Sequence, residues 1–302
     1  MKNAVFIASI FFLSLLIALG ADADERLKVV ASFSIIGDMV KQVAGNNVDL
    51  EVLVGPNGDA HEYEPTTANA RSLSHANIVF INGLGLEGWI ERLIQSSAFK
   101  GKAVVVTQGI TPLESEAHGH SAPDPHAWQN LENGKTYVAN IRDALAQADP
   151  LHAAEYQSNA ARYLQKLDTL DKWTKTEIAQ VEPSKCKVIS MHDSFHYFAK
   201  QYGVTFIAPL GISTESEASA ADMARIIDQV RQQHITAVFL ENMTDSRLMR
   251  QLESDAGAHI GGTLYSDALS APGEPASTYT DMFTYNVTKL VAAMQQNPAK
   301  KE

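Results

Sequence analysis

Four polar side chains lie just beyond strand-like runs of the sequence, and their types are those that hold metal ions. His61 and His126 follow such runs in the first half of the chain, each after a loop. His192 and Asp267 each come two residues after a run in the second half. In parallel α/β sheets ligands gather beyond the carboxyl ends of the strands, so a cleft between two halves could bring these four together. Three imidazoles and one carboxylate form an N₃O set that suits Zn²⁺, which accepts nitrogen and oxygen ligands without requiring sulfur.

The fold must place these residues at strand ends, and the sequence predicts one that does. Short β-branched or apolar runs alternate with helical stretches, which indicates parallel sheets covered on both faces and hence the α/β class. The runs are 27–32, 50–54, 78–81, 103–106, 187–190, 204–208, 237–240 and 262–265.

A stretch without strand-like runs separates the two series. Residues 150–182 have apolar positions broadly at helical spacing, and a proline lies at each end of the stretch. The sequence therefore predicts two α/β lobes joined by one long helix. The expected organisation is a signal peptide at 1–23, an N-terminal lobe at 24–149, a linking helix at 150–183 and a C-terminal lobe at 184–302.

The N-terminus has the layout of a targeting segment. Lys2 precedes an apolar run at 4–19, and the small residues Ala21 and Ala23 follow it. The run is shorter than the ~20 residues that span a bilayer, and an A-x-A cleavage site comes directly after it. No cysteine lies near that site to carry a lipid. We therefore expect a cleaved signal peptide and a mature protein in the periplasm that is not lipid-anchored.

Composition excludes several kinds of partner and site. The chain has 302 residues, with 35 acidic against 24 basic side chains and a net charge of −11, which argues against nucleic acid as a partner. Its single cysteine, Cys186, excludes an intramolecular disulfide, a cysteine-cage zinc site and an iron–sulfur cluster. Cys186 has no evident base beside it, so a buried structural thiol is expected.

Two patterns resemble enzyme motifs, and both are weak. Residues 192–196 read His-Asp-Ser-Phe-His, one methylene short of the H-E-x-x-H pattern of zinc proteases. That chemistry needs both histidines on an established helix and an open coordination position, whereas His192 ends a β-branched run. Gly83-x-Gly85-x-x-Gly88 has the spacing of a dinucleotide fingerprint, but a lone match is a weak signal. We therefore expect a protein without catalytic residues. A zinc-dependent hydrolase is the alternative function that would make it an enzyme.

Five segments of the chain resemble the signature stretches of one known family. The segments are 55–65, 79–87, 124–128, 191–198 and 265–269. Together they resemble the metal-binding solute-binding proteins of bacterial ABC importers (cluster A-I, the ZnuA/TroA-like group) in their zinc-binding form, over essentially the whole mature chain. The resemblance implies two lobes with parallel sheets flanked by helices, one long rigid helix between them, and a metal buried in the interlobe cleft.

The resemblance also implies the ligands and the cargo. Carried over by position, the ligands are His61, His126, His192 and Asp267. Manganese-type members commonly have glutamate as the third ligand, so His192 favours Zn²⁺. We therefore expect a periplasmic high-affinity zinc-binding protein, with a manganese or iron receptor of the same family as the alternative. The expected partner is an ABC permease, a periplasmic zinc metallochaperone is a further candidate, and the protein is expected to be a monomer.

Three more histidines could act as auxiliary metal-capture residues. His118 and His120 lie in the segment 113–125, which is expected to be an exposed loop. They could bind metal weakly and pass it to the cleft, and a solvated loop is the equally favoured alternative. His196 stands where a small residue is usual in the family and comes four residues after His192, on the same side of any helix that starts there. We expect His196 to lie outside the set of metal ligands or at the surface. The alternative is that it acts as an extra ligand.

Overall fold

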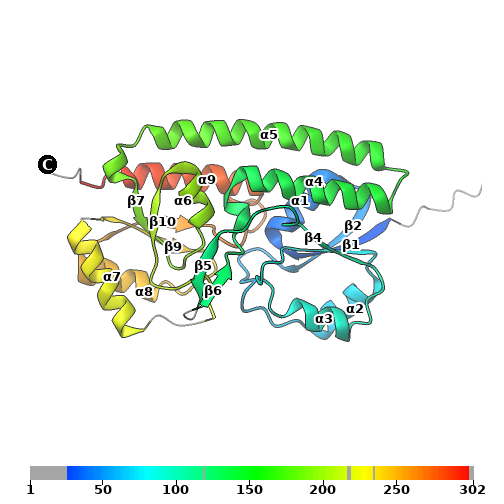
Figure 1. The fold of residues 1–302 in the computed structure, drawn as a ribbon, viewed down its shortest axis with the longest axis horizontal. Coiled ribbons are helices and arrows are strands. Elements are labelled where there is room, and N and C mark those ends of the chain that lie inside the picture. Colours follow the sequence, from blue (N-terminus) through cyan, green and yellow to red (C-terminus); the bar gives the residue numbers. More distant parts are fainter. Residues whose placement is uncertain (1–25, 118–119, 216–218, 234, 299–302) are drawn as a thin grey trace, which may run out of the picture.

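Two parallel sheets flanked by helices form the protein, as the alternating runs predicted. The computed structural model describes residues 26–117, 120–215, 219–233 and 235–298. One sheet belongs to the N-terminal lobe and one to the C-terminal lobe, and a long helix runs along both (Figure 1). The segment 1–23, expected to be a signal peptide, lies outside the described residues. Within the described ranges, no helix is both long and apolar enough to cross a membrane.

The N-terminal lobe contains a sheet of strand order β2-β1-β3-β4, in which all neighbouring strands are parallel. Strand β1 is buried from Val29 to Phe33, and a parallel strand buried in this way needs helices on both faces of its sheet. In Figure 1, α1 and α4 lie above the sheet, and α2 and α3 lie below it. The elements are β1 (Leu27–Phe33), α1 (Ser34–Ala44), β2 (Val48–Val54), α2 (Thr67–His75), β3 (Ile78–Ile81), α3 (Ile90–Ser96), β4 (Lys102–Val105) and α4 (Leu131–Ala148).

The C-terminal lobe repeats this arrangement with strand order β10-β9-β7-β8, again parallel throughout. Helix α8 packs on β9 and β10, and α9 packs on β7 and β10. The elements are β7 (Lys187–Ile189), α6 (His196–Tyr202), β8 (Thr205–Ile207), α7 (Ala220–Gln233), β9 (Ala237–Glu241), α8 (Arg247–Ala256), β10 (His259–Leu264) and α9 (Tyr279–Met294).

Helix α5 (Ala153–Ala179) joins the lobes and lies within the range 150–183 that the sequence predicted. Its buried residues recur every three or four positions along one face, as in an amphipathic helix. At about 1.5 Å per residue, its 27 residues span roughly 40 Å. It packs on α1 and α4 of the first lobe and on α9 of the second (Figure 1). The helix therefore contacts both lobes rather than only linking them.

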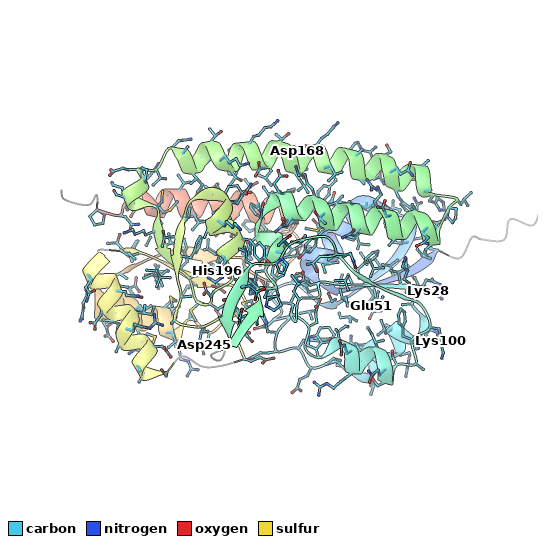
Figure 2. All side chains as sticks on the ribbon, in the orientation of Figure 1. Lys28, Glu51, Lys100, Asp168, His196 and Asp245 are labelled. Carbon is cyan, nitrogen blue, oxygen red and sulfur yellow. The ribbon has the colours of Figure 1, made fainter. Side chains whose placement is uncertain are left out.

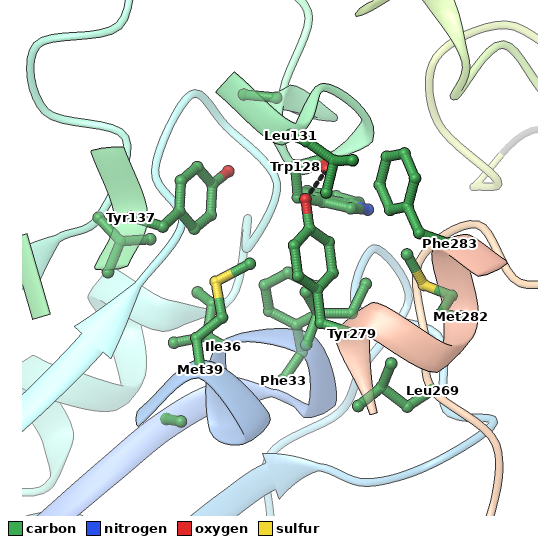
Figure 3. Close-up of a cluster of buried hydrophobic side chains, with 14 of the residues drawn as sticks. Phe33, Ile36, Met39, Trp128, Leu131, Tyr137, Leu269, Tyr279, Met282 and Phe283 are labelled. Carbon is green, nitrogen blue, oxygen red and sulfur yellow. Dashed lines mark hydrogen bonds between the residues drawn. The ribbon is translucent and has the colours of Figure 1, made fainter. Parts of the chain in front are cut away.

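One hydrophobic core extends through both lobes. Figure 3 shows part of it, where Phe33 and Trp128 of the N-terminal lobe meet Tyr279 and Phe283 of α9. The ring centroids of Phe33 and Trp128 are 5.1 Å apart, and the Tyr279 hydroxyl donates to the backbone oxygen of Trp128. All four side chains are buried. Because the core is not divided at the lobe boundary, moving the lobes apart would expose apolar surface to water.

The segment 113–125 contains a hairpin, so the expectation of a loop without strands is wrong, although Glu114 and Ser121 are exposed as expected. Strands β5 (Glu114–Ala117) and β6 (His120–Pro123) pair antiparallel. The segment has none of the β-branched or aromatic residues that are typical of strands, so its composition gave no sign of one. Tertiary contacts support the hairpin instead: the backbone N–H of Leu113 donates to the hydroxyl of Tyr197 in α6 at 3.0 Å.

Candidate metal centre

The four residues predicted as ligands meet between the lobes. His61 lies in the loop after β2, and His126 lies just before the short 3-10 helix Ala127–Gln129. His192 follows β7 and Asp267 follows β10, both at the carboxyl ends of their strands. One possible ligand atom from each residue lies within 4.8 Å of those from the other three, and all four residues are buried. The structure thus brings them together at the position in the fold that the sequence indicated.

Most of the distances known between the four donor atoms are close to those that a single small cation requires. Oδ2 of Asp267 lies 3.1 Å from Nε2 of His192 and 3.3 Å from Nε2 of His61. Its distance to Nε2 of His126 is 3.7 Å, and the Nε2 atoms of His61 and His126 are 3.3 Å apart. A tetrahedron with bonds of about 2.0–2.1 Å has edges of about 3.3–3.4 Å, so a cation of the size of Zn²⁺ fits between these atoms.

Three polar atoms at this centre have no hydrogen-bond partner among the described residues. They are Nε2 of His192 and both carboxylate oxygens of Asp267. Nε2 of His192 and Oδ2 of Asp267 are 3.1 Å apart. Buried polar atoms are nearly always satisfied, so such a group of unsatisfied atoms indicates a missing ligand. A cation between them would satisfy Nε2 of His192 and the oxygen of Asp267 that faces it.

Two buried carboxylates orient two of the imidazoles. Oδ1 of Asp124 lies 2.7 Å from Nδ1 of His126, and Oε2 of Glu241 lies 2.6 Å from Nδ1 of His192. A proton on each Nδ1 donates to the carboxylate, which leaves Nε2 of the neutral ring with a lone pair for a metal. The hydroxyl of Ser266 donates to Oε2 of Glu241 at 2.9 Å and fixes that carboxylate in turn.

Asp124 and Glu241 were not assigned a role from the sequence. Glu241 is the last residue of β9, directly after the run 237–240, so the strand-end rule that selected His192 and Asp267 applies to it as well. Asp124 lies in the 124–128 segment that carried part of the family resemblance. A signal was present for both residues, but it did not distinguish a ligand from a group that orients a ligand.

The charges of the site balance one another in the absence of metal. Burial lowers the pKa of His126, but the charges of Asp267 and Asp124 outweigh it and raise that pKa to about 9. Burial opposes the charged form of His192 as well, yet Glu241 and Asp267 raise its pKa well above the usual value. Burial raises the pKa of Asp267, but the charges of His192 and His126 hold it well below its usual range. Metal-free His126 and His192 therefore carry protons that an incoming metal must displace.

His61 has no carboxylate of this kind behind its ring in the part of the chain that is described, and its loop is fixed through the backbone. The backbone N–H of His61 donates to Oδ1 of Asp59 at 2.8 Å, and Nε1 of Trp89 donates to the carbonyl of Ala60 at 2.8 Å. Oδ2 of Asp59 accepts a hydrogen bond from the Thr214 hydroxyl at 2.7 Å. Because Thr214 belongs to the C-terminal lobe, this contact also joins the two lobes.

Of the three auxiliary histidines, His196 has a side chain that the structure describes, and it is not one of the four. His118 lies outside the described residues, and His120 is the first residue of β6. His196 is the first residue of α6, and Figure 2 labels it near the middle of the molecule. Its ring nitrogens face the carboxylates of Asp124 and Asp193.

Neither enzyme pattern has the geometry that its chemistry needs. Helix α6 begins at His196, so His192 and Asp193 precede it and do not share a helical face with His196. Asp193 pairs with His196 instead of facing the site. In the glycine pattern, the carboxylate of Glu87 accepts the backbone N–H of Gly83 at 3.2 Å, so this donor is not available to a phosphate.

Two α/β lobes with a buried, cation-sized site between their strand ends define a metal-binding solute-binding protein. A family model described as "Zinc-uptake complex component A periplasmic", ZnuA, matches residues 29–293, and the chain belongs to this family. It is the metal-binding, substrate-binding component of an ABC importer, whose partner is the importer's permease and ATPase. Members of the family bind and deliver a substrate, so the protein is not an enzyme.

Similar proteins are named for three different metals. The manganese-binding lipoprotein MntA of Halalkalibacterium halodurans is 32% identical over 98% of this chain and 100% of its own length. The iron ABC transporter substrate-binding lipoprotein MtsA of Streptococcus pyogenes serotype M1 is 34% identical over 88% of either chain. The structure of the periplasmic zinc-binding protein TroA from Treponema pallidum matches with a TM-score of 0.85 and 28% identity, over 90% of this chain and 100% of that one. The similarity therefore shows a metal as cargo without specifying which metal.

The expectation of a protein that is not lipid-anchored is wrong. Both MntA and MtsA are named lipoproteins, a class that a covalent lipid holds at a membrane surface. The expectation depended on the absence of a cysteine near Ala23, in a segment outside the described residues. The names of these relatives contradict it.

Proposed function

We propose that this protein captures Zn²⁺ through His61, His126, His192 and Asp267 and delivers it to an ABC permease. The observation that supports the proposal best is the set of buried, unsatisfied atoms at the centre, contributed by His192 and Asp267. Three neutral imidazoles and one carboxylate would leave the zinc complex with a charge of +1. The two carboxylates behind the imidazoles would more than offset that charge and bring the group to a net charge of −1.

The types of donor favour zinc over manganese. Zn²⁺ accepts imidazole nitrogen and carboxylate oxygen in a tetrahedron, whereas Mn²⁺ is bound mainly by oxygen ligands in octahedral sites. Here His192 supplies a third imidazole, and the carboxylate of Asp267 completes the set. A manganese or iron receptor is the alternative, because relatives are named for these metals.

We propose that the metal reaches the site through a cleft between the lobes. The cleft has a volume of about 470 Å³ and is lined by residues of both lobes. Asp59 and Glu62 on its wall flank His61, and Met191 on its wall precedes His192. His61 is the least buried of the four proposed ligands, at 6% exposure. A cation attracted by the acidic wall would therefore meet His61 first.

The proposal includes a capture role for His118 and His120, which could take zinc from solution or from a zinc metallochaperone. A double variant with alanine at both positions should load zinc more slowly than wild type in rapid mixing. If the double variant loads zinc as fast as wild type from both sources, the two histidines have no capture role.

We also propose that the protein acts as a monomer, which light scattering on the zinc-loaded chain would test.

Calorimetry on the purified protein, freed of metal by chelation, tests the cargo. Zn²⁺ should bind tightly at one site per chain, and His192→Ala or Asp267→Ala should weaken binding by orders of magnitude because each removes a ligand. His259→Ala is the matched control, since His259 is an exposed histidine of the same lobe. Titrations with Mn²⁺ and Fe²⁺ complete the experiment. Tight Mn²⁺ or Fe²⁺ binding with weak Zn²⁺ binding would overturn the zinc assignment.

A further inference from the structure

His196 connects the two lobes beside the metal centre. It begins α6 in the C-terminal lobe and lies near the hairpin β5–β6 (Figure 2). Its Nδ1 lies 3.0 Å from Oδ2 of Asp124, which belongs to the N-terminal lobe. Its Nε2 lies 2.8 Å from Oδ1 of Asp193. Each ring nitrogen therefore faces a carboxylate, an arrangement that requires a proton on both nitrogens.

Asp124 transmits this contact to a proposed ligand. Its Oδ1 accepts the backbone N–H of His126 at 2.9 Å and lies 2.7 Å from Nδ1 of the same residue. The hydroxyl of Tyr197, the next residue of α6, donates to the backbone oxygen of Asp124 at 2.8 Å. The start of one helix thus holds both the side chain and the backbone of Asp124, and Asp124 holds the ring of His126.

The charges of His196, Asp124 and Asp193 also favour a protonated His196 ring between the two carboxylates. Hydrogen bonds to Asp124 and Asp193 raise the pKa of His196 to about 10, although burial opposes its charge. The side chain of His196 is 34% exposed, whereas that of Asp124 is 0% exposed. A cation beside a buried carboxylate keeps that carboxylate ionised and in place. Removal of the His196 ring would leave Oδ2 of a buried charge without this partner, which is a costly state.

We propose that His196 is a positioning residue of the metal site, which holds Asp124 across the lobe boundary so that Asp124 fixes the ring of His126 for metal binding. It is not a ligand, because carboxylates engage both of its ring nitrogens. The contact ties α6 of one lobe to a ligand-bearing loop of the other, so it also opposes the loop movement that would release the metal. The inference rests on the proposed function, since it requires His126 to bind the cargo.

The rate of zinc release tests this role. His196→Ala should release Zn²⁺ to a chromogenic chelator roughly tenfold faster than wild type, because losing a group behind a metal-bound histidine weakens metal affinity ~10–100-fold. His196→Asn, whose amide nitrogen lies near the position of Nδ1 and can still donate to Asp124, should be intermediate. His152→Ala is the matched control: His152 forms a pair with Asp149 at 2.7 Å, its side chain is 31% exposed, and it lies at the start of α5. Its release rate should equal that of wild type.

A second measurement needs no metal. In the metal-free protein, NMR of ¹⁵N-labelled histidine follows exchange with water of the Nδ1 proton of His126, which Asp124 holds. His196→Ala should speed this exchange, and His152→Ala should not. Unchanged exchange, or unchanged release from a protein that binds zinc, would overturn the role of His196. A wild-type protein that binds no Zn²⁺ would instead overturn the proposed function, and the exchange measurement would still decide the role of His196.

Discussion

The indole Nε1 of Trp128 donates a hydrogen bond to the backbone oxygen of Ser266 at 2.8 Å, across the boundary between the lobes. Trp128 lies two residues after His126, and Ser266 directly precedes Asp267, so the bond joins two loops that carry proposed ligands. Nε2 of Gln129 donates to the same oxygen at 2.7 Å. These groups are buried. The spacing between ligands of different lobes is therefore set by protein contacts before any metal binds.

Metal binding should leave the lobes in place. The shared core, α5 and the Trp128–Ser266 bond all resist a swinging motion of one lobe against the other. Spin labels on cysteines introduced at the exposed positions Lys100 and Arg225, one in each lobe, should report the same mean distance with and without zinc. The native Cys186 is buried and should not compete for the label. A shift of several ångströms on adding zinc would show that the lobes close around the metal.

Glu241→Gln should weaken zinc binding ~10–100-fold, which is the usual cost of altering the carboxylate behind a metal-bound histidine. Glutamine still offers an oxygen to the Nδ1 proton of His192, but the negative charge that makes the ring a stronger ligand is lost. Competition with a fluorescent chelator measures the change. Asp255→Asn is the control, because Asp255 is an exposed carboxylate of the same lobe whose Oδ2 accepts a hydrogen bond from Gln251 at 3.3 Å. Equal losses in the two variants would mean that overall charge, and not this contact, sets the affinity.

The positions of the proposed ligands could be predicted because a local rule governs them. His192 and Asp267 each come just after a strand, and parallel strands bring their carboxyl ends to one edge of a sheet. Glu241 obeys the same rule and yet stands behind His192. Which strand-end residue faces a ligand and which supports it depends on side-chain directions between neighbouring strands, and one sequence read alone does not contain them.

Contacts between distant segments account for what the sequence did not predict. The hairpin β5–β6 has no strand-like composition, and the contact of Leu113 with Tyr197 in α6 helps to hold it. The pairing of His196 with Asp124 joins residues 72 positions apart. Helical periodicity placed His196 on the side of His192, but it could not show that a carboxylate from the other lobe occupies the space between His196 and the metal site.

The metal-free protein should lose stability as the pH rises from about 6.5 to about 9. Burial lowers the pKa of His126, but Asp267 and Asp124 raise it to about 9 in the folded protein, against about 6.5 in an unfolded chain. The folded state therefore binds this proton more tightly, so the stabilisation is complete below about pH 6.5 and is lost as the pH rises through about 9. Urea unfolding of chelator-treated protein at both ends of this range measures the loss.

Zinc affinity should change in the opposite direction over the same range. The proton on His126 competes with the metal, so affinity should rise with pH until the ring is mostly deprotonated. The zinc-loaded protein serves as the control for stability, because a metal-bound ring has no proton to lose there. Metal-free protein that is equally stable or more stable at the alkaline end would contradict the assigned pKa shift.

Gly134→Ala should destabilise the protein, although alanine normally stabilises a helix relative to glycine by about 1 kcal/mol. Gly134 lies in α4, and a Cβ at this position would be 2.8 Å from the hydroxyl oxygen of Tyr279 in α9. Tyr279 is fully buried and donates to the backbone oxygen of Trp128, so it cannot move aside freely. Overpacking of this kind typically costs about 1–3 kcal/mol of unfolding free energy, which urea titration of the zinc-free protein would measure.

Two variants separate this clash from a general effect of replacing glycine. Gly88→Ala should change the unfolding free energy by less than about 0.5 kcal/mol, because a Cβ there meets nothing within 4 Å. Tyr279→Phe should cost about 1 kcal/mol on its own, since it removes one buried hydrogen bond. Combined with Gly134→Ala it should cost less than the sum of the two, because the oxygen that the new methyl group meets is then absent. If the changes in unfolding free energy of the two single variants simply add in the double variant, the lobes are not packed this closely at the Gly134–Tyr279 contact.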